Sequence, residues 1–476
     1  MIIVYLVPIL IYLSILTLIG IYKSRQVKTQ QDFSVAGRTL SPWVMVLTML
    51  AVWIGTGSIL GNAEEAYRTG MAALIIPFGT FIGMILLSLI ATRARNIEAM
   101  SVPEIIGSRF GITARFLAVI ALIIAYMVIV SYQFNAGGAV IEVISESAVS
   151  KQTATLIAAI FIITFTMLAG LKSLAGMDTI TGSIITITLL ITFPVFLYKA
   201  GGFEGMQNAY DMQNKSSHMQ FWGVYSPVQL INYLLPVFLL VMGDANQYQR
   251  IFASRNARGA KQAVIVLIFA ALAIELLIIA SAWVAGSMTP EEEGGRYILI
   301  YAAKEQLPVY LGILFMITVV GIIISTADSF LLVPATTFIN DVYSTYINPK
   351  AEQKKIIFIS RALVLLFGVI AYLVTHAFAE TTGFFHKALY AYTIYGSAIT
   401  PALVAALFWK RATKAGAVSS IVTGTVVTLI WSENFIQNNL PASLAELDAV
   451  LPAITLSVIC LVVVSLLTSP KTVRSS

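Results

Sequence analysis

The residues best suited to chemistry form a short cluster, Ser325, Thr326, Asp328 and Ser329, within an otherwise apolar segment. Spacings of three and four residues place Ser325, Asp328 and Ser329 on one face of a helix, with Thr326 one step round. Hydroxyl and carboxylate oxygens are the ligands that small alkali cations require. Each hydroxyl alone could instead bond back to the preceding turn of its own helix. That alternative accounts poorly for four polar residues within five positions, so the cluster predicts a cation site.

A second stretch, residues 51–65, can supply backbone oxygens to such a site. Gly55, Gly57 and Gly61, with Thr56 and Ser58 between them, interrupt an apolar run that begins near residue 41. Glycine weakens a helix interior and lets the backbone open. An opened backbone at membrane depth is tolerated where it lines a polar cavity, and its freed carbonyls can hold a cation. The alternative is that these small residues let two helices pack closely.

The composition shows what must position these residues. The chain has 476 residues, of which 58% are hydrophobic and 11% are charged, and these values exclude a soluble domain and indicate a polytopic membrane protein. The first apolar run is too long for a cleavable signal, and its basic residues follow it. The single cysteine excludes a disulfide framework. The sequence shows no nucleophile–base pair, metal-ligand spacing or phosphate-binding loop, so we expect no enzyme activity, organic cofactor or nucleic-acid partner.

Hydropathy and length predict an all-α protein with about 13 membrane helices. The expected spans are 2–22, 41–66, 71–92, 113–146, 152–170, 176–198, 226–248, 259–286, 309–343, 355–377, 386–409, 414–432 and 448–468. Most basic residues fall on one side, among them Arg93, Arg95, Arg250 and Lys354, and the positive-inside rule makes that side cytoplasmic. We therefore expect a multi-pass protein of the cell membrane with its N-terminus outside and its C-terminus cytoplasmic.

The spans fall into two sets of five, residues 41–198 and 226–409, within a single transporter domain over residues 1–476. Because five is odd, the second set would run inverted in the membrane relative to the first. One extra helix (2–22) precedes them and two (414–468) follow. The second set also carries a break, at residues 243–246, which matches the break in the first. Paired breaks in two halves are the mark of an inverted-repeat transporter, so they favour a binding site over simple close packing.

Other acids in the apolar segments are Asp178, Asp244 and Glu275. An acid within a membrane is a functional-site hypothesis by default because it is costly to bury. Asp178 could alternatively be a favourable acid near a helix N-terminus. Glu275 has no obvious partner in the sequence and is left unassigned.

The motifs of the chain resemble the sodium/solute symporter family, which includes proline permease, the sodium/glucose cotransporters and the choline transporters. The similarity extends over nearly the whole chain. The motifs that carry it are Phe33-Ser-Val-Ala-Gly-Arg38, Trp53-Ile-Gly-Thr-Gly-Ser58, Gly170-Leu-Lys-Ser-Leu-Ala-Gly-Met-Asp178, Gln249-Arg250, Ser325-Thr-Ala-Asp-Ser329, Asn340-Asp-Val-Tyr343 and Leu407-Phe-Trp-Lys410. The resemblance implies the LeuT-type five-plus-five inverted repeat, with one extra helix before it and two after.

The resemblance also implies the ion sites. The shared sodium site would use the backbone carbonyls of Ala51, Ile54 and Ile322 with the hydroxyls of Ser325 and Thr326. Some members bind a further cation beside the acid that corresponds to Asp178. In this chain Ser325, Asp328 and Ser329 would complete that second cation site, although Asp328 replaces a common serine. Sodium would be the coupling ion.

For the solute, Trp53 stands where proline permease has an acid and the choline transporters have a tryptophan, while Asp244 lies at the second break. An aromatic face beside a carboxylate suits an amine. Alternatively, Trp53 packs against 113–146, and Asp244 meets Arg250 or helix-end amides. The full set of expected substrate-binding residues is Trp53, Thr56, Ser58, Gln133, Asp244, Asn246, Tyr392 and Tyr395.

These observations predict a sodium-coupled symporter that imports an amino acid, amine or quaternary ammonium compound by alternating access. The alternatives are a symporter for a carboxylate, vitamin or sugar, and a sensor or channel-like protein on the same scaffold.

Overall fold

The computed structural model describes residues 2–25, 27–168, 170–289, 295–377, 382–431, 433–439, 441, 444 and 446–468. Within these ranges the chain is helical and forms no strand; one isolated bridge joins Leu40 to Ser254. Twelve helices are long and apolar enough to cross a membrane, and the bent pair Pro42–Trp53 and Gly57–Ile75 would make a thirteenth span.

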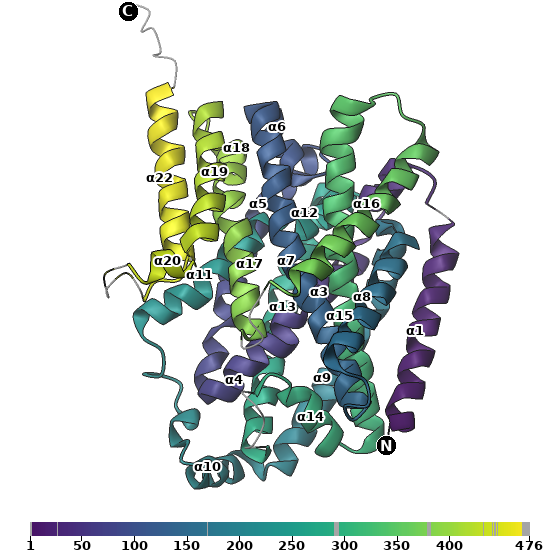
Figure 1. Cartoon of the computed structure of the whole chain (residues 1–476), viewed down its shortest axis with the longest axis vertical. Coiled ribbons are helices and arrows are strands. Elements are labelled where there is room, and N and C mark those ends of the chain that lie inside the picture. The colour runs from purple at the N-terminus through teal and green to yellow at the C-terminus, as the bar shows by residue number, and fades with distance from the viewer. Residues whose placement is uncertain are drawn as a thin grey trace, which may run out of the picture.

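The long helices lie side by side in one bundle (Figure 1). The spanning helices are α1 (Ile2–Ser24), α3 (Pro42–Trp53), α5 (Pro77–Asn96), α7 (Ile112–Ile144), α8 (Lys151–Leu168), α9 (Leu171–Lys199), α11 (Pro227–Gly243), α12 (Ala245–Ala253), α13 (Ala257–Met288), α15 (Val309–Phe338), α16 (Gln353–Val374), α17 (Phe384–Ala398), α18 (Thr400–Phe408), α19 (Lys414–Trp431) and α22 (Val450–Thr468). The shorter helices are α2 (Gln30–Val35), α4 (Ala63–Thr69), α6 (Val102–Phe110), α10 (Gly202–Met212), α14 (Ile298–Glu305) and α20 (Asn434–Gln437).

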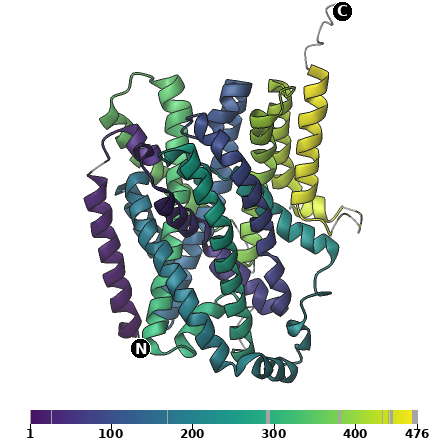
Figure 2. The same cartoon turned by 180° about the vertical axis from the view of Figure 1, so that it is seen from behind.

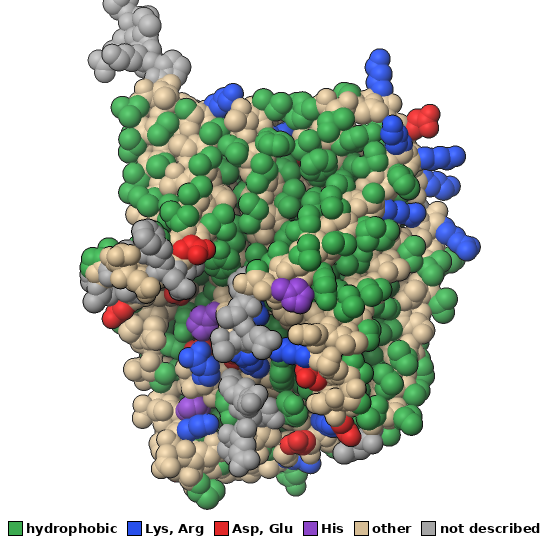
Figure 3. All heavy atoms as spheres, in the orientation of Figure 1, with side chains coloured by type: hydrophobic (Ala, Val, Ile, Leu, Met, Phe, Trp, Pro, Cys, Tyr) green, Lys and Arg blue, Asp and Glu red, His purple; other side chains and the backbone are tan. Residues whose placement is uncertain are grey.

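Helices α1 and α22 lie at opposite edges of the bundle, and the view from behind shows the same arrangement (Figure 2). The chain begins at one end of the bundle, and α22 finishes at the other. Green hydrophobic side chains cover much of the outer face in Figure 3, as a surface in contact with lipid requires.

The predicted break in the first repeat is present. Helix α3 ends at Trp53, Ile54 has non-helical angles (φ −75°, ψ 88°), and the chain bends by 56° before it continues from Gly57. Gly55 permits the close approach of this break to α15, because a Cβ there would lie 2.9 Å from Cγ2 of Thr326. The predicted span over 41–66 therefore consists of helical pieces on either side of the predicted break.

The second predicted break is also present. Helix α11 ends at Gly243, Asp244 has non-helical angles (φ −55°, ψ 112°), and α12 begins at Ala245. The Asp244 side chain accepts a hydrogen bond from the backbone N–H of Asn246 and so caps the start of α12.

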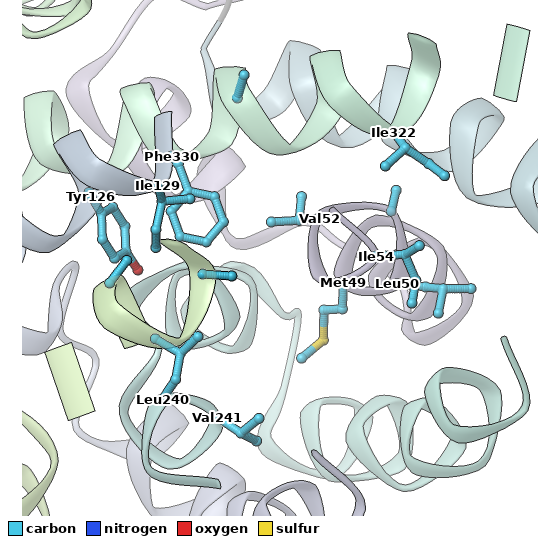
Figure 4. Close-up of a cluster of buried hydrophobic side chains, with 14 of the residues drawn as sticks. Met49, Leu50, Val52, Ile54, Tyr126, Ile129, Leu240, Val241, Ile322 and Phe330 are labelled. Atoms are coloured by element: carbon cyan, nitrogen blue, oxygen red, sulfur yellow. The ribbon is translucent and has the colours of Figure 1, made fainter. Parts of the chain in front are cut away.

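Buried apolar side chains hold the two breaks against their neighbours. Figure 4 shows Met49 and Val52 of α3, Ile129 of α7, Leu240 of α11 and Phe330 of α15 in one cluster, and all five are buried. Association of helices in a membrane depends on such close packing, since lipid is as apolar as the side chains themselves.

One helix boundary changes the interpretation of a site residue. Helix α9 begins at Leu171, directly after Gly170, rather than at 176 as predicted. Asp178 therefore lies two turns inside the helix, where the backbone N–H groups already have partners within the helix. The alternative that Asp178 is an acid of the first helical turn is wrong.

Candidate functional site

The break after α3 meets the polar cluster of α15. The Ser325 hydroxyl donates to the Ala51 carbonyl at 3.0 Å and to the Ile322 carbonyl at 3.3 Å. The Thr326 hydroxyl donates to the Val52 carbonyl at 3.5 Å. Both hydroxyls are buried. Helix α15 thus places two hydroxyl oxygens beside the last carbonyls of α3.

This cluster has the composition of a site for one small alkali cation. Its oxygens come from hydroxyls and backbone carbonyls, which are uncharged and suit a monovalent ion. The Ser325 hydroxyl contacts two of the carbonyls in the expected ligand set, those of Ala51 and Ile322. The Thr326 hydroxyl contacts Val52, which was not predicted. Ile54 lies at the break itself, where its non-helical ψ of 88° turns its carbonyl out of the helical direction.

Arg250 occupies the surroundings of the predicted second cation site. Its Nη2 lies 3.1 Å from Oδ2 of Asp178 and donates to the Ser329 hydroxyl at 2.8 Å. Its Nε donates to the hydroxyl of Thr48 at 3.1 Å, and Thr48 donates to Asp178 at 2.6 Å. The Arg250 side chain has no exposed surface. The sequence groups Arg250 with the basic residues of one side, but α12 turns this side chain into the bundle and not toward solvent.

Asp328 lies in the same electrostatic environment without a direct ion pair. It is 2% exposed, Asp178 and Arg250 are its charged neighbours, and its Oδ1 has no hydrogen-bond partner among the described residues. Two carboxylates and one guanidinium sum to one formal negative charge. A buried charge of this kind requires a counter-ion or a proton.

A small cavity lies on another side of the first break. Residues predicted to bind substrate line it, namely Trp53, Ser58 and Tyr392, together with Gly57. A Cβ on Gly57 would lie 2.6 Å from the Tyr392 hydroxyl, so only glycine allows this approach of α17. The cavity measures about 20 Å³, which is room for roughly one water molecule.

The other predicted substrate residues lie away from this cavity. Thr56 hydrogen-bonds to Gln133 of α7. At the second break, Tyr126 donates to Asp244 at 2.6 Å, and Tyr395 donates to the Gly243 carbonyl at 2.8 Å. These bonds agree with the alternative that Asp244 satisfies local groups at the helix end.

Asn246 is buried next to that cluster, and its side-chain amide has no hydrogen-bond partner among the described residues. The structure therefore divides the predicted substrate residues between the first break, the second break and the Thr56–Gln133 pair.

Glu275 has no role that the sequence assigns, and its position is the main addition from the structure. Glu275 lines the cavity at the first break, and its Oε1 accepts a hydrogen bond from Trp53 Nε1 at 2.8 Å. The sequence signal for a functional role of Glu275 was the position of this acid in an apolar segment. The partner could not be identified because Trp53 is 222 positions distant in the sequence.

These features define a class of protein. Two broken helices within a helical membrane bundle, with a cation-type oxygen cluster at one break, are typical of secondary transporters of the inverted-repeat type.

Sequence comparison identifies the family. The model of the Sodium:solute symporter family matches residues 33–424, and the chain belongs to that family. It is therefore a sodium-coupled solute symporter. The osmoregulated proline transporter OpuE of Bacillus subtilis is 24% identical, with 96% of this chain and 94% of that protein covered. The sodium/proline symporter of Haemophilus influenzae is 24% identical, with 90% of this chain and 88% of that protein covered.

Structural comparison supports the same fold. A Na⁺-coupled sialic acid symporter in a substrate-bound outward-open state superposes with a TM-score of 0.81 at 16% identity, covering 98% of each chain. Mhp1, a nucleobase-cation-symport-1 family transporter, gives a TM-score of 0.57 at 12% identity, with 92% of this chain and 95% of that chain covered. The predicted LeuT-type fold is confirmed.

Proposed function

We propose that this symporter imports a small amino acid, with L-proline as the first candidate, together with sodium. The observation that carries the proposal is the contact of the α3 break with Ser325 and Thr326, because it puts the proposed ion ligands and the proposed solute cavity at one helix break. The relatives named as proline transporters, each matched over most of its length, support this substrate class.

Sodium would be held by the carbonyls of Ala51, Ile54 and Ile322 and by the hydroxyls of Ser325 and Thr326. A bound ion would require both hydroxyls to turn their lone pairs toward it and to give up their present bonds to carbonyls. The binding energy of sodium would hold the break of α3 against α15. Sodium would thereby fix the position of the residues that line the cavity on the other side of the same break.

The second cation site remains a proposal in modified form. Arg250 already provides one positive charge to Asp178 and Ser329, while Asp328 keeps an unpartnered oxygen. We propose that a further monovalent cation would bind at Asp328 and share Asp178 with Arg250, which would neutralise the remaining negative charge.

The direction and mechanism follow from the proposed topology. We propose that the N-terminus lies outside and the C-terminus in the cytoplasm of a cell membrane, so that the inward sodium gradient drives import. Segments 41–198 and 226–409 would be the two repeats, which rock against each other around the two breaks.

Uptake into proteoliposomes tests the proposal. The purified full-length protein would be given an inward sodium gradient or an equal potassium gradient, with radiolabelled L-proline, choline, glucose and pantothenate as a panel. We expect sodium-driven accumulation of L-proline that potassium does not support. Accumulation of glucose or pantothenate without any amino acid would contradict the proposed substrate class, and downhill flux without sodium dependence would contradict symport.

A further inference from the structure

Glu275 is a buried acid that belongs to neither of the proposed ion sites. It lies in the middle of α13, is 3% exposed, and lines the cavity at the first break with Trp53, Thr80 and Tyr392. It therefore faces the space that the proposed solute would enter.

The two oxygens of the Glu275 carboxylate have different surroundings. Oε1 accepts from Trp53 Nε1 at 2.8 Å and from the Thr80 hydroxyl at 3.4 Å. Oε2 is buried and has no hydrogen-bond partner among the described residues. No lysine, arginine or histidine in the described part of the chain forms an ion pair with Glu275. A buried carboxylate without a counter-ion is costly. A ligand that carries a positive group into the cavity would supply that counter-ion.

The other walls of the cavity restrict the shape of that ligand. Apolar side chains form much of the lining, and Ser58 and Asn62 are its further polar residues. The lining on the apolar side consists of Ile76, Val237, Phe385, Ala388 and Leu389. Because the present volume of about 20 Å³ holds roughly one water molecule, the cavity must widen to admit a solute. The cavity suits a small apolar body with one cationic nitrogen.

We propose that Glu275 binds the positively charged nitrogen of the transported solute through Oε2, while Trp53 orients the carboxylate through Oε1 and presents its ring to the same cation. This inference rests on the proposed amino-acid function and deepens it, because it names the residue that recognises the amine. The carboxylate at the second break, Asp244, has its own partners in Tyr126 and Asn246. We therefore assign the binding of the amine to Glu275 and not to Asp244.

The sharpest test compares two ligands that differ at one atom. Tetrahydro-2-furoate has the ring and carboxylate of L-proline, with an ether oxygen in place of the charged nitrogen. Its inhibition of sodium-driven L-proline uptake would be measured in proteoliposomes for the wild type, Glu275→Gln and Glu275→Asp. We expect the wild type to prefer L-proline by about 100-fold and Glu275→Gln to reduce this preference to less than about tenfold.

Three further results are expected. The half-saturating sodium concentration of Glu275→Gln should stay within about twofold of the wild type, since the proposed sodium ligands are unchanged. Glu275→Asp should keep most of the preference, because the charge remains. Glu65→Gln is the matched control, since Glu65 is a buried glutamate that contacts Arg68 and Tyr225, and its preference should not change.

The outcomes separate this inference from the proposed function. If the wild type transports L-proline and Glu275→Gln keeps the wild-type preference, the role of Glu275 is overturned while the substrate class stands. An equal loss of apparent affinity for sodium and for L-proline in Glu275→Gln would overturn the role of Glu275 as well. If the wild type transports no amino acid or amine, the proposed function fails first. Should Glu275→Gln not fold, Trp53→Phe removes the donor to Oε1 and should lower the same preference.

Discussion

Thr326 and Thr318 are both buried threonines of α15, but only Thr326 faces the α3 break. Thr326→Ala should raise the half-saturating sodium concentration about tenfold, because one ligand oxygen is lost and about 1.4 kcal/mol corresponds to that factor. The measurement is L-proline uptake against sodium concentration at equal protein in the membrane. Thr318 bonds to Thr188 and to its own helix, so Thr318→Ala should leave sodium activation near the wild type. An unchanged sodium dependence in Thr326→Ala would remove this residue from the site.

For Asp178 the prediction concerns stability as well as transport, because this acid forms a buried ion pair with Arg250. Asp178→Asn leaves a fully buried guanidinium without its carboxylate, and removal of one partner of a buried pair costs about 3–5 kcal/mol. We expect a lower thermal unfolding temperature and loss of sodium-driven uptake. The double variant Asp178→Asn, Arg250→Gln should recover much of the stability without recovering the wild-type sodium-to-solute ratio.

Asp32 supplies the control for that experiment. It lies in the first turn of α2, completes a capping box with Thr29, and forms a partly exposed ion pair with Lys172. Asp32→Asn should cost about 1 kcal/mol or less and leave uptake intact. Wild-type uptake and wild-type stoichiometry in Asp178→Asn would show that this acid does not serve ion coupling.

At the scale of the elements, the contact of the α3 break with α17 depends on one glycine. Gly57→Ala would place a methyl group 2.6 Å from the Tyr392 hydroxyl, and overpacking of this kind costs about 1–3 kcal/mol. We expect a lower unfolding temperature for Gly57→Ala and recovery of most of the loss when Tyr392→Phe removes that hydroxyl. An additive loss in the double variant would mean that the two residues do not meet.

The sequence predicted the helical elements and the two breaks well, because each depends on local signals. Apolar length identifies the spans, and glycines at 55 and 57 mark the first break. The contact of Ser325 with Ala51 was predicted through the resemblance to a known family. The cap at Asp244 was one of two open interpretations, and the bond from the Asn246 N–H agrees with it.

The pairing of distant polar groups could not be predicted in the same way. Arg250 resembles the other basic residues near a helix end, and only the rotation of α12 against α9 and α15 brings it to Asp178 and Ser329. The partner of Glu275 is likewise on another helix, because Trp53 of α3 donates to its carboxylate. Such contacts depend on which faces of separate helices meet, and single-sequence periodicity does not determine that.

At the scale of the whole molecule, the topology has a direct test. Met212 at the end of α10 is 80% exposed, and Lys350 just before α16 is also exposed. Helix α10 lies at the end of the bundle where α1 begins, whereas the connection between α15 and α16 lies at the other end (Figure 1). In a Cys460→Ser background, a membrane-impermeant maleimide should label Met212→Cys on intact cells and Lys350→Cys only after permeabilisation. The reverse pattern would place the N-terminus inside.

Helix α15 carries the proposed sodium hydroxyls of Ser325 and Thr326 and also the Ser329 hydroxyl, which accepts from Arg250. Ser325 and Ser329 are separated by a rise of about 6 Å, slightly more than one helical turn. The proposed sodium site and the Asp178–Arg250 pair are therefore close enough to be coupled through α15, and a coupling free energy between two sites is reciprocal. Whatever factor sodium adds to the strength of the Asp178–Arg250 pair, the intact pair must add to the affinity for sodium. A double-mutant cycle on the pair, performed with and without sodium, would therefore give the same coupling energy as a sodium titration of the four proteins.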